Sequence, residues 1–302
     1  MRSLSSLALV ACFAVSTPAL AFPTAGPGSP GGGHNISRAL RSFIKTQKAK
    51  DVVLPKNAAD YRYVLVKGVI GDAYPRYMAR DLAALKGRGL QAEFAPIDTG
   101  AGVAHNSAVI EQMIRTTDKP IVFIGHSKGV ADTTDAIGRM AKENPQLVQA
   151  RVRGLVAIEG AYRGSQVADK LASTGWGNRL MKTIAWAVRG KPEAGLDLRT
   201  SVRDAAVKDH PMPTNLVPTA SLIGYKLSPL RSILGATILY MKKLGLRSDG
   251  LVAHGAAHID GSDFAYANYD HGAGAFFGNS DKMMLGLLGH VLEQPQILVG
   301  TP

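Results

Sequence analysis

The sequence predicts an α/β protein with a mostly parallel central sheet and helices on both faces. Short apolar segments of strand character alternate with longer segments whose apolar residues recur at helical spacing. A second indication is Gly125-His126-Ser127-Lys128-Gly129, which follows an apolar run and leads into a helix-compatible segment. Because parallel strands need long, usually helical, crossovers, this alternation favours successive βα units. A chain of 302 residues is long enough for one large domain of this class.

The predicted elements are taken in chain order. Strands are expected at residues 61–66, 93–97, 121–124, 154–158, 217–224 and 263–269, and helices at residues 38–50, 77–86, 106–115 and from the serine turn to about residue 142. The first helix is expected to be capped by Ser37 and to have one apolar face. That face either packs on the domain or lies on a membrane surface, and both alternatives stay open. The chain contains no internal repeat and no heptad pattern.

The N-terminus resembles a leader for export. Arg2 is followed by an apolar core over residues 7–15, and Ala19-Leu20-Ala21 has the small-residue pattern of a cleavage site. We expect cleavage after Ala21 and a periplasmic or secreted protein. An alternative is lipid attachment at Cys12, which lies in a lipobox-like sequence. Cleavage after Ala21 removes this single cysteine, so no disulfide is expected.

The rest of the chain divides into an arm and one domain. Residues 22–50 are expected to form a Pro/Gly-rich flexible arm and the short basic helix, and residues 51–302 the domain, with insertions near 162–210 and 226–247. The formal net charge of +12 favours anionic partners, including peripheral contact with an anionic membrane surface. Nucleic acid is not expected, because no recognition motif or basic–aromatic alternation is present.

The glycine-flanked serine is the strongest candidate for chemistry. A Gly-X-Ser-X-Gly sequence between a strand and a helix holds the serine on a sharp turn, and the small glycines leave room for that turn. Ser127 is therefore the candidate nucleophile. Backbone N–H groups of Val69, which follows Gly68, and of Lys128 are the candidate oxyanion-hole donors.

A serine nucleophile needs a base and an acid from later strands. His271 follows the last predicted strand, and Asp249 lies on a turn before that strand. This gives the order Ser127, Asp249, His271. Glu159, at the end of an earlier strand, is the rival acid.

Two further features leave alternatives open. His254, His258 and Asp260 have a spacing that a metal site also uses, but the intervening Gly255-Ala256-Ala257 is not a metal-binding helix motif, so neither a metal nor another cofactor is expected. Lys67 and Lys128 flank the serine and the oxyanion loop. Their ammonium groups either face the cleft or extend into water.

These segments resemble the α/β-hydrolase family, and within it the bacterial triacylglycerol lipases and esterases. The resemblance is carried by Val64-Leu65-Val66-Lys67-Gly68, Val122-Phe123-Ile124-Gly125-His126-Ser127-Lys128-Gly129, Ile158-Glu159-Gly160-Ala161-Tyr162-Arg163-Gly164-Ser165 and Ser248-Asp249-Gly250-Leu251-Val252. It implies an α/β-hydrolase fold with helical lid insertions. The family's histidine before the oxyanion glycine is Lys67 here, and its calcium-binding pattern is absent around His271.

The sequence therefore predicts an exported serine hydrolase that cleaves carboxylic esters, small or lipidic, through an acyl-enzyme. Residues 171–191 and 227–246 are rich in large apolar side chains and form either lids over an acyl pocket or ordinary core helices. Polyester, thioester and amide hydrolysis with the same residues are alternatives. A non-catalytic envelope-binding protein on the same scaffold is a third reading.

Overall fold

A computed structural model describes residues 33–69, 71–174, 193–276 and 279–295 of the chain. Its centre is a six-stranded parallel sheet in the order β2-β1-β3-β4-β5-β6. The strands are β1 (Arg62–Val66), β2 (Gln91–Phe94), β3 (Ile121–His126), β4 (Val152–Ile158), β5 (Thr219–Gly224) and β6 (Asp263–Ala267). The α/β prediction is confirmed, and each predicted strand overlaps an observed one.

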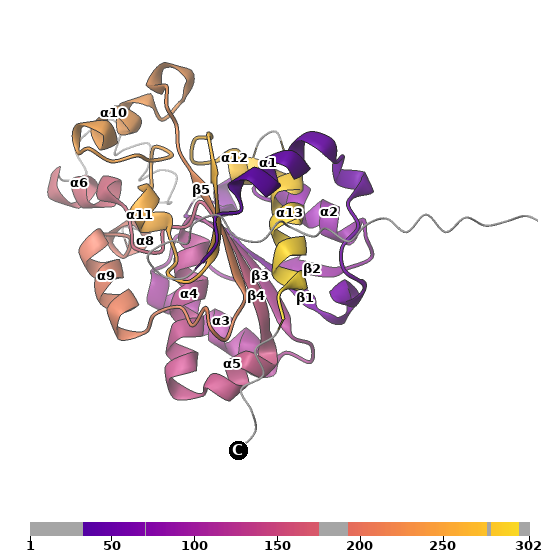
Figure 1. Ribbon diagram of the computed structural model, residues 1–302. Helices are drawn as coiled ribbons and strands as arrows, with labels where there is room; N and C mark the ends of the chain where they lie inside the picture. The colour runs from indigo at the N-terminus through magenta and orange to yellow at the C-terminus, as the bar shows by residue number, and fades with distance from the viewer. Residues whose placement is uncertain (1–32, 70, 175–192, 277–278, 296–302) are drawn as a thin grey trace, which may run out of the picture.

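The helices that the structure describes lie on both faces of this sheet and in the two insertions. They are α1 (Ser37–Thr46), α2 (Ala79–Lys86), α3 (Val103–Thr116), α4 (Lys128–Glu143), α5 (Pro145–Arg151), α6 (Gln166–Thr174), α8 (Glu193–Leu196), α9 (Thr200–Asp209), α10 (Gly235–Lys243), α11 (His254–Ala257), α12 (Ala273–Phe276) and α13 (Ser280–Glu293). Figure 1 shows α13 and α2 on one side of the sheet and α3, α4 and α5 on the other. Within the described residues, no helix combines the length and the apolar character that a membrane crossing requires.

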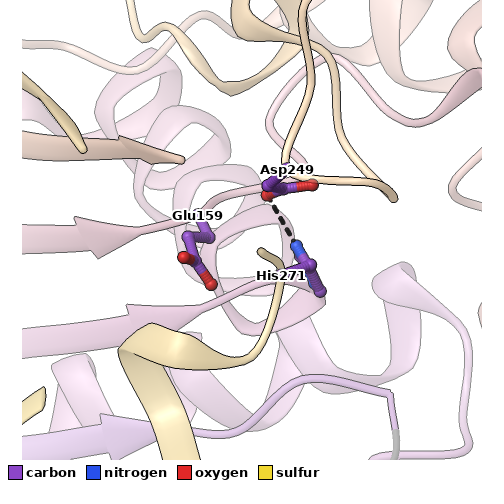
Figure 2. Close-up of side chains that lie close together, drawn as sticks. All are labelled: Glu159, Asp249 and His271. Carbon is purple, nitrogen blue, oxygen red and sulfur yellow. Dashed lines mark hydrogen bonds and ion pairs between the residues drawn. The ribbon is translucent and has the colours of Figure 1, made fainter. Parts of the chain in front are cut away.

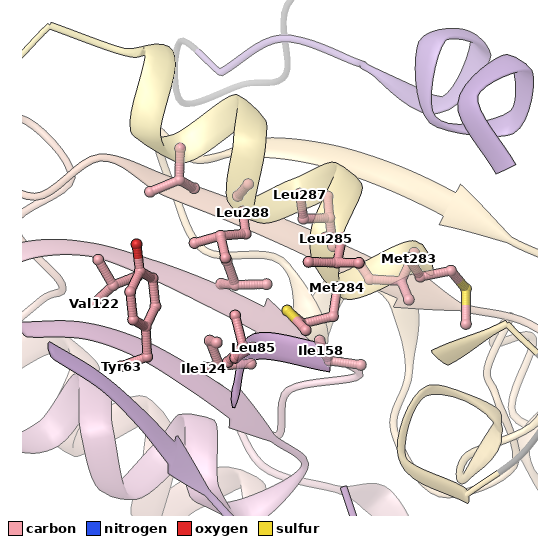
Figure 3. Close-up of a cluster of buried hydrophobic side chains, with 14 of the residues drawn as sticks. Tyr63, Leu85, Val122, Ile124, Ile158, Met283, Met284, Leu285, Leu287 and Leu288 are labelled. Atoms are coloured by element: carbon pink, nitrogen blue, oxygen red, sulfur yellow. The ribbon is translucent and has the colours of Figure 1, made fainter. Parts of the chain in front are cut away.

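Alternate residues of the central strands supply the two cores. In β1, Tyr63 and Leu65 face one core, and Val64 and Val66 face the other. This two-residue period is what a strand buried on both faces requires. Figure 3 shows the first core, in which apolar side chains of α13 pack over the strands. Residues of this core that the figure labels are Tyr63, Leu85, Val122, Ile124, Ile158, Met283, Met284, Leu285, Leu287 and Leu288.

The N-terminal part of the domain extends the sheet beyond β6. The N–H of Phe264 donates to the carbonyl of His34, and the N–H of Ile36 donates to the carbonyl of Phe264. The helix α1 then places Leu40 and Phe43 against α13. The apolar face of this helix is therefore buried in the domain.

Local differences from the prediction have clear physical causes. Ser37 is the first residue of α1 and not its cap, because Asn35 Oδ1 accepts the Ser37 N–H at 3.0 Å. That helix ends at Thr46, short of the predicted residue 50. The strand β2 ends at Phe94, since Pro96 has no N–H to continue the ladder.

The predicted lid segments are described in part. The first insertion contributes α6, α8 and α9, and the second contributes α10. Helix α6 contacts α10, and both lie at the left of Figure 1, away from α13. Residues 175–192, with Trp176 and Trp186, lie outside the described residues, as do the predicted leader and residues 22–32 of the arm.

Candidate active site

Ser127 occupies the turn between β3 and α4. Its backbone angles are φ 57° and ψ −124°, a conformation that L-residues adopt rarely and only where surrounding contacts impose it. Those contacts come from the neighbouring strand, because the Ser127 N–H donates to the Ile158 carbonyl at 3.0 Å. The Ser127 carbonyl accepts from the N–H groups of Val130 and Ala161, each at 3.1 Å. The turn thus holds the hydroxyl at the N-terminus of a 16-residue helix.

Two glycines allow the backbone to come close to this turn. A Cβ on Gly129 would lie 2.2 Å from the Val66 carbonyl oxygen, and one on Gly68 would lie 2.8 Å from Ser127 Cβ. Neither approach leaves room for a larger residue. The loop after β1, where the oxyanion hole is predicted, therefore lies directly against the serine.

The three predicted catalytic side chains are hydrogen-bonded in series. His271 Nε2 lies 2.8 Å from Ser127 Oγ, and His271 Nδ1 lies 2.8 Å from Asp249 Oδ2. The serine has a relative exposure of 9 % and the aspartate of 1 %. A neutral imidazole in this arrangement donates its Nδ1–H to the carboxylate and presents Nε2 as an acceptor to the hydroxyl.

The carboxylate of Asp249 is itself held by the turn that carries it. Its Oδ1 accepts the N–H groups of Leu251 and Val252 at 2.9 and 2.8 Å, which leaves Oδ2 for His271. The His271 N–H also donates to the Asp249 carbonyl at 2.9 Å. Both the side chain and the backbone of the histidine are therefore fixed by one residue.

Part of the second insertion lies next to Asp249 and His271. A Cβ on Gly250 would lie 2.9 Å from Leu234 Cβ, so the segment before α10 packs on the Asp249 turn. Ser232 Oγ donates to Asp270 Oδ2 at 2.8 Å. The insertion is thus connected to the residue that precedes His271.

The rival acid, Glu159, lies in the same region but bonds other groups. Its Oε2 accepts from His126 Nε2 and from the Gly272 N–H, both at 3.1 Å. Figure 2 shows Glu159 beside the bonded pair of Asp249 and His271. One ligand-type atom from each of these three residues lies within 4.8 Å of the others. The observed hydrogen bonds occupy such atoms of all three residues, and the carboxylate bonded to His271 is that of Asp249, not that of Glu159.

A buried chain of hydrogen bonds that the sequence does not reveal begins at Glu159. His126 Nδ1 bonds the Tyr77 hydroxyl, and that hydroxyl accepts the Gly68 N–H at 3.0 Å. His126 is 1 % exposed, and this burial, with His271 nearby, holds its pKa well below the ordinary value. One contact of this hydrogen-bond chain could have been predicted from the sequence. His126 ends one strand and Glu159 follows the next, and adjacent parallel strands end at the same edge of the sheet.

The loop of the predicted oxyanion residue Val69 lies against the serine, and the side chain of Lys128 departs from both expectations. Val69 is half-buried in the loop after Gly68. Lys128 neither faces the cleft nor reaches water, because its ammonium is fully buried against Asp132. The Lys67 ammonium lies 4.3 Å from the centre of the Phe94 ring and 3.8 Å from an Asp72 oxygen.

The residues of the alternative metal site are engaged elsewhere. His254 stacks on Tyr266 with ring centroids 5.0 Å apart, and His258 contacts the ring of Phe264 at 4.9 Å. Asp260 lies 2.6 Å from Arg163 Nη2. The structure does not bring these three residues into one cluster of potential ligands among the described residues.

Neither a family model nor a curated protein matches the chain. Solved structures do match its fold. A metagenomic carboxyl esterase is 22 % identical, with 82 % of this chain and 80 % of that one covered and a TM-score of 0.63. A Bacillus licheniformis lipase in its mature form is 21 % identical over 80 % of this chain and 93 % of that one, with a TM-score of 0.57. Lipase 1 from Pelosinus fermentans is 12 % identical over 80 % and 100 % of the two chains, with a TM-score of 0.52. With its parallel sheet and the strand–turn–helix at Ser127, the chain has the α/β-hydrolase fold of these esterases and lipases.

Proposed function

We propose that the protein is a serine hydrolase that cleaves carboxylic esters. The observation that carries this proposal is the series of hydrogen bonds from Ser127 through His271 to Asp249, built on a strained turn. Such a series activates a hydroxyl that is otherwise a weak nucleophile. The esterase and lipases among the structural neighbours support the same reaction class.

In the proposed reaction, Ser127 Oγ attacks the ester carbonyl carbon while His271 Nε2 takes the hydroxyl proton. The carbonyl oxygen becomes an oxyanion, and the N–H groups of Val69 and Lys128 are the donors that we propose for it. Collapse of this intermediate expels the alcohol, which receives the proton from His271. Water activated by the same histidine then attacks the acyl-enzyme, and the acid is released with Ser127 restored. Asp249 stabilises the imidazolium in both halves.

A fluorophosphonate probe tests whether the serine is activated. Labelling of Ser127 in the purified protein, and its loss in Ser127→Ala, are the expected results. A series of p-nitrophenyl esters of increasing chain length then defines the acyl preference. A wild-type protein that takes up no probe and cleaves no ester defeats the proposal and leaves the non-catalytic binding protein. A labelled protein that cleaves only amides or thioesters defeats the ester assignment alone, and one that cleaves only polyesters restricts the substrate to polymeric esters.

We also propose that the segment before and within α10 rests on an anionic lipid surface. Leu230 and Ile233 are 96 % and 94 % exposed, and Leu227, Leu239 and Leu244 are also exposed. Residues 226–247 contain five lysines and arginines and no aspartate or glutamate. Exposed apolar side chains in a segment whose charged residues are all basic match the chemistry of an interface between acyl chains and anionic headgroups. The face of α1, the other candidate for this contact, is buried against α13.

Sedimentation with vesicles tests this surface. We expect binding to phosphatidylglycerol vesicles, weak binding to phosphatidylcholine vesicles, and loss of binding in a Leu230→Ser, Ile233→Ser variant. Val53→Ser is the matched control, because Val53 is 66 % exposed and lies in another part of the molecule. Equal binding by the variant and the wild type would contradict the proposal.

Export remains a proposal as well. We propose that the leader is cleaved after Ala21 and that the protein acts in the periplasm or outside the cell. The mature N-terminus, determined by mass spectrometry of the protein from the envelope and culture medium, tests this. Phe22 as the first residue supports cleavage after Ala21, whereas a diacylglycerol on Cys12 supports the lipoprotein alternative.

A further inference from the structure

A continuous buried hydrogen-bond chain links the two loops that flank the proposed nucleophile. At one end, the Gly68 N–H donates to the Tyr77 hydroxyl at 3.0 Å, and this hydroxyl bonds His126 Nδ1. At the other end, Glu159 Oε2 lies 3.1 Å from both His126 Nε2 and the Gly272 nitrogen. The three side chains come from the loop before α2 and from the ends of β3 and β4.

Burial fixes the direction in which the protons of this chain point. It lowers the pKa of His126 well below the ordinary value, so the imidazole is neutral and carries one N–H. It also raises the pKa of Tyr77, which therefore keeps its hydroxyl proton. The Gly272 N–H donates to Glu159 Oε2, so this oxygen is an acceptor. His126 Nε2 then donates to the same oxygen, and Nδ1 accepts from Tyr77. The Tyr77 oxygen is then available to accept the Gly68 N–H.

The two ends of this hydrogen-bond chain lie next to groups whose positions matter most for the proposed reaction. Gly68 precedes Val69, the proposed oxyanion donor, and a Cβ on Gly68 would lie 2.8 Å from Ser127 Cβ. Gly272 follows His271. The ring centroids of His126 and His271 are 5.1 Å apart, so the middle of the chain contacts the base itself.

We propose that Tyr77, His126 and Glu159 are positioning residues, which hold the oxyanion loop and the His271 loop at a fixed separation around Ser127. This proposal rests on the proposed function. The chain has a second effect, because the Glu159 carboxylate lies close enough to His271 to stabilise the imidazolium formed during attack.

Several titratable groups lie around His271. Asp249 faces it from the turn before β6, Glu159 from the end of β4, and His126 from the end of β3. Asp270 precedes it in the same loop. Only Glu159 among these carboxylates bonds the His126 chain.

Tyr77→Phe tests the position of the oxyanion loop, because it removes the acceptor for the Gly68 N–H and the donor to His126. We expect kcat to fall about 10- to 100-fold with KM within about twofold, and a trifluoromethyl ketone analogue of the intermediate to bind more weakly by the same factor. Ser221→Ala is the matched control, since it removes a buried hydrogen bond between Ser221 of β5 and Ser262 and leaves the Tyr77–His126–Glu159 hydrogen bonds intact. A Tyr77→Phe variant with wild-type kcat overturns the proposal.

Glu159→Gln and Glu159→Ala separate charge from hydrogen bonding. Glutamine keeps an acceptor for the His126 and Gly272 N–H groups, so we expect kcat to stay within about tenfold. The acid limb of kcat/KM moves to lower pH, because a negative charge that favours imidazolium is lost. Alanine loses the acceptor and lowers kcat further. An unmoved acid limb in Glu159→Gln, or wild-type kcat in Glu159→Ala, overturns the proposal.

These outcomes are distinct from a failure of the proposed function. A wild-type protein that neither hydrolyses esters nor reacts with a fluorophosphonate defeats the proposed reaction, and the positioning proposal with it. An active wild type whose Tyr77 and Glu159 variants behave like Ser221→Ala defeats the positioning proposal alone.

Discussion

The ammonium of Lys128 lies 2.8 Å from Asp132 Oδ1 and 2.9 Å from Oδ2, and neither side chain is exposed. Asn106 Nδ2 donates to the same carboxylate at 2.9 Å. The residue that follows the proposed nucleophile therefore directs its charge into the core of the molecule. In the proposed reaction only the backbone N–H of Lys128 takes part, and its side chain bonds Asp132 within the first turns of α4.

This buried pair predicts a large effect on stability. Asp132→Asn leaves the Lys128 charge without its counter-ion, which is expected to cost about 3–5 kcal/mol in free energy of unfolding. Urea denaturation of the purified variant measures the change. A Lys128→Met, Asp132→Leu double variant removes both charges and is expected to lose much less. If Asp132→Asn unfolded at the wild-type urea midpoint, the pair would have no stabilising role.

The two carboxylates beside His271 are expected to differ in their effect on turnover. Asp249→Asn presents an amide to Nδ1 and favours the wrong tautomer, so kcat should fall by about 10⁴-fold. Glu159→Gln should reduce kcat far less, because it leaves the bond between Asp249 and His271 in place. Steady-state kinetics on one p-nitrophenyl ester compares them. A reversal of the two losses would identify Glu159 as the acid.

Gly129→Ala tests the close approach of α4 to β1. The added methyl group would lie 2.2 Å from the Val66 carbonyl oxygen and 2.8 Å from that of Lys67, and backbone atoms at both places cannot move aside easily. We expect a loss of about 1–3 kcal/mol or more in stability and a displaced Ser127. Gly255→Ala is the control, because nothing lies within 4 Å of its Cβ position. Equal melting temperatures of the two variants would contradict the packing argument.

Asp81 predicts a dependence of stability on pH. Burial between α2 and α13, assisted by the nearby Asp281, raises the pKa of Asp81 from 3.8 to about 8. The folded protein therefore keeps a proton that the unfolded chain releases above about pH 4. The contribution of Asp81 to the free energy of unfolding is fully present below the pKa of this group in the unfolded chain. It is lost as the pH rises toward 8, the pKa in the folded protein.

Asp81→Asn removes this titration, since an amide is neutral at every pH. Between about pH 4 and 8 the wild type should lose up to roughly 1.4 kcal/mol per pH unit from this group, and the variant should not. Urea midpoints across this range measure the two slopes. Asp60→Asn, at an exposed position, is the control. Parallel slopes for the wild type and Asp81→Asn would show that Asp81 is ionised in the fold.

Much of the candidate site could be predicted, because it depends on a short sequence motif and on the order of the strands in the sheet. The sequence around Ser127 specifies the turn by itself, through its two glycines. Asp249 and His271 follow from the strand order, because the carboxyl ends of parallel strands meet at one edge of the sheet. The fold class follows from the same alternation of strands and helices, and the sheet order confirms it.

The side-chain partners were not predictable in this way. Tyr77 and His126 are 49 residues apart in the chain, and no local pattern links a tyrosine before a helix to a histidine at the end of a strand. Lys128 and Asp132 are four residues apart, a spacing usual for exposed pairs on a helix surface. Only the packing of α3 over α4 shows that this pair is inside. The prediction that Ser37 caps α1 was wrong because Asn35, two residues earlier, also carries a side-chain oxygen that can accept a backbone N–H.

The pairing of residues near His34 with β6 has a consequence for biosynthesis. The Phe264 N–H reaches the His34 carbonyl, and the side chain of Asp263 accepts the His34 N–H across 229 positions of sequence. A ribosome that adds about 5–20 residues per second needs roughly 10 to 50 s to make the intervening chain. For that interval the segment near His34 lacks its partner strand, β6. The order of synthesis therefore keeps the nascent chain from completing this sheet until β6 has been made.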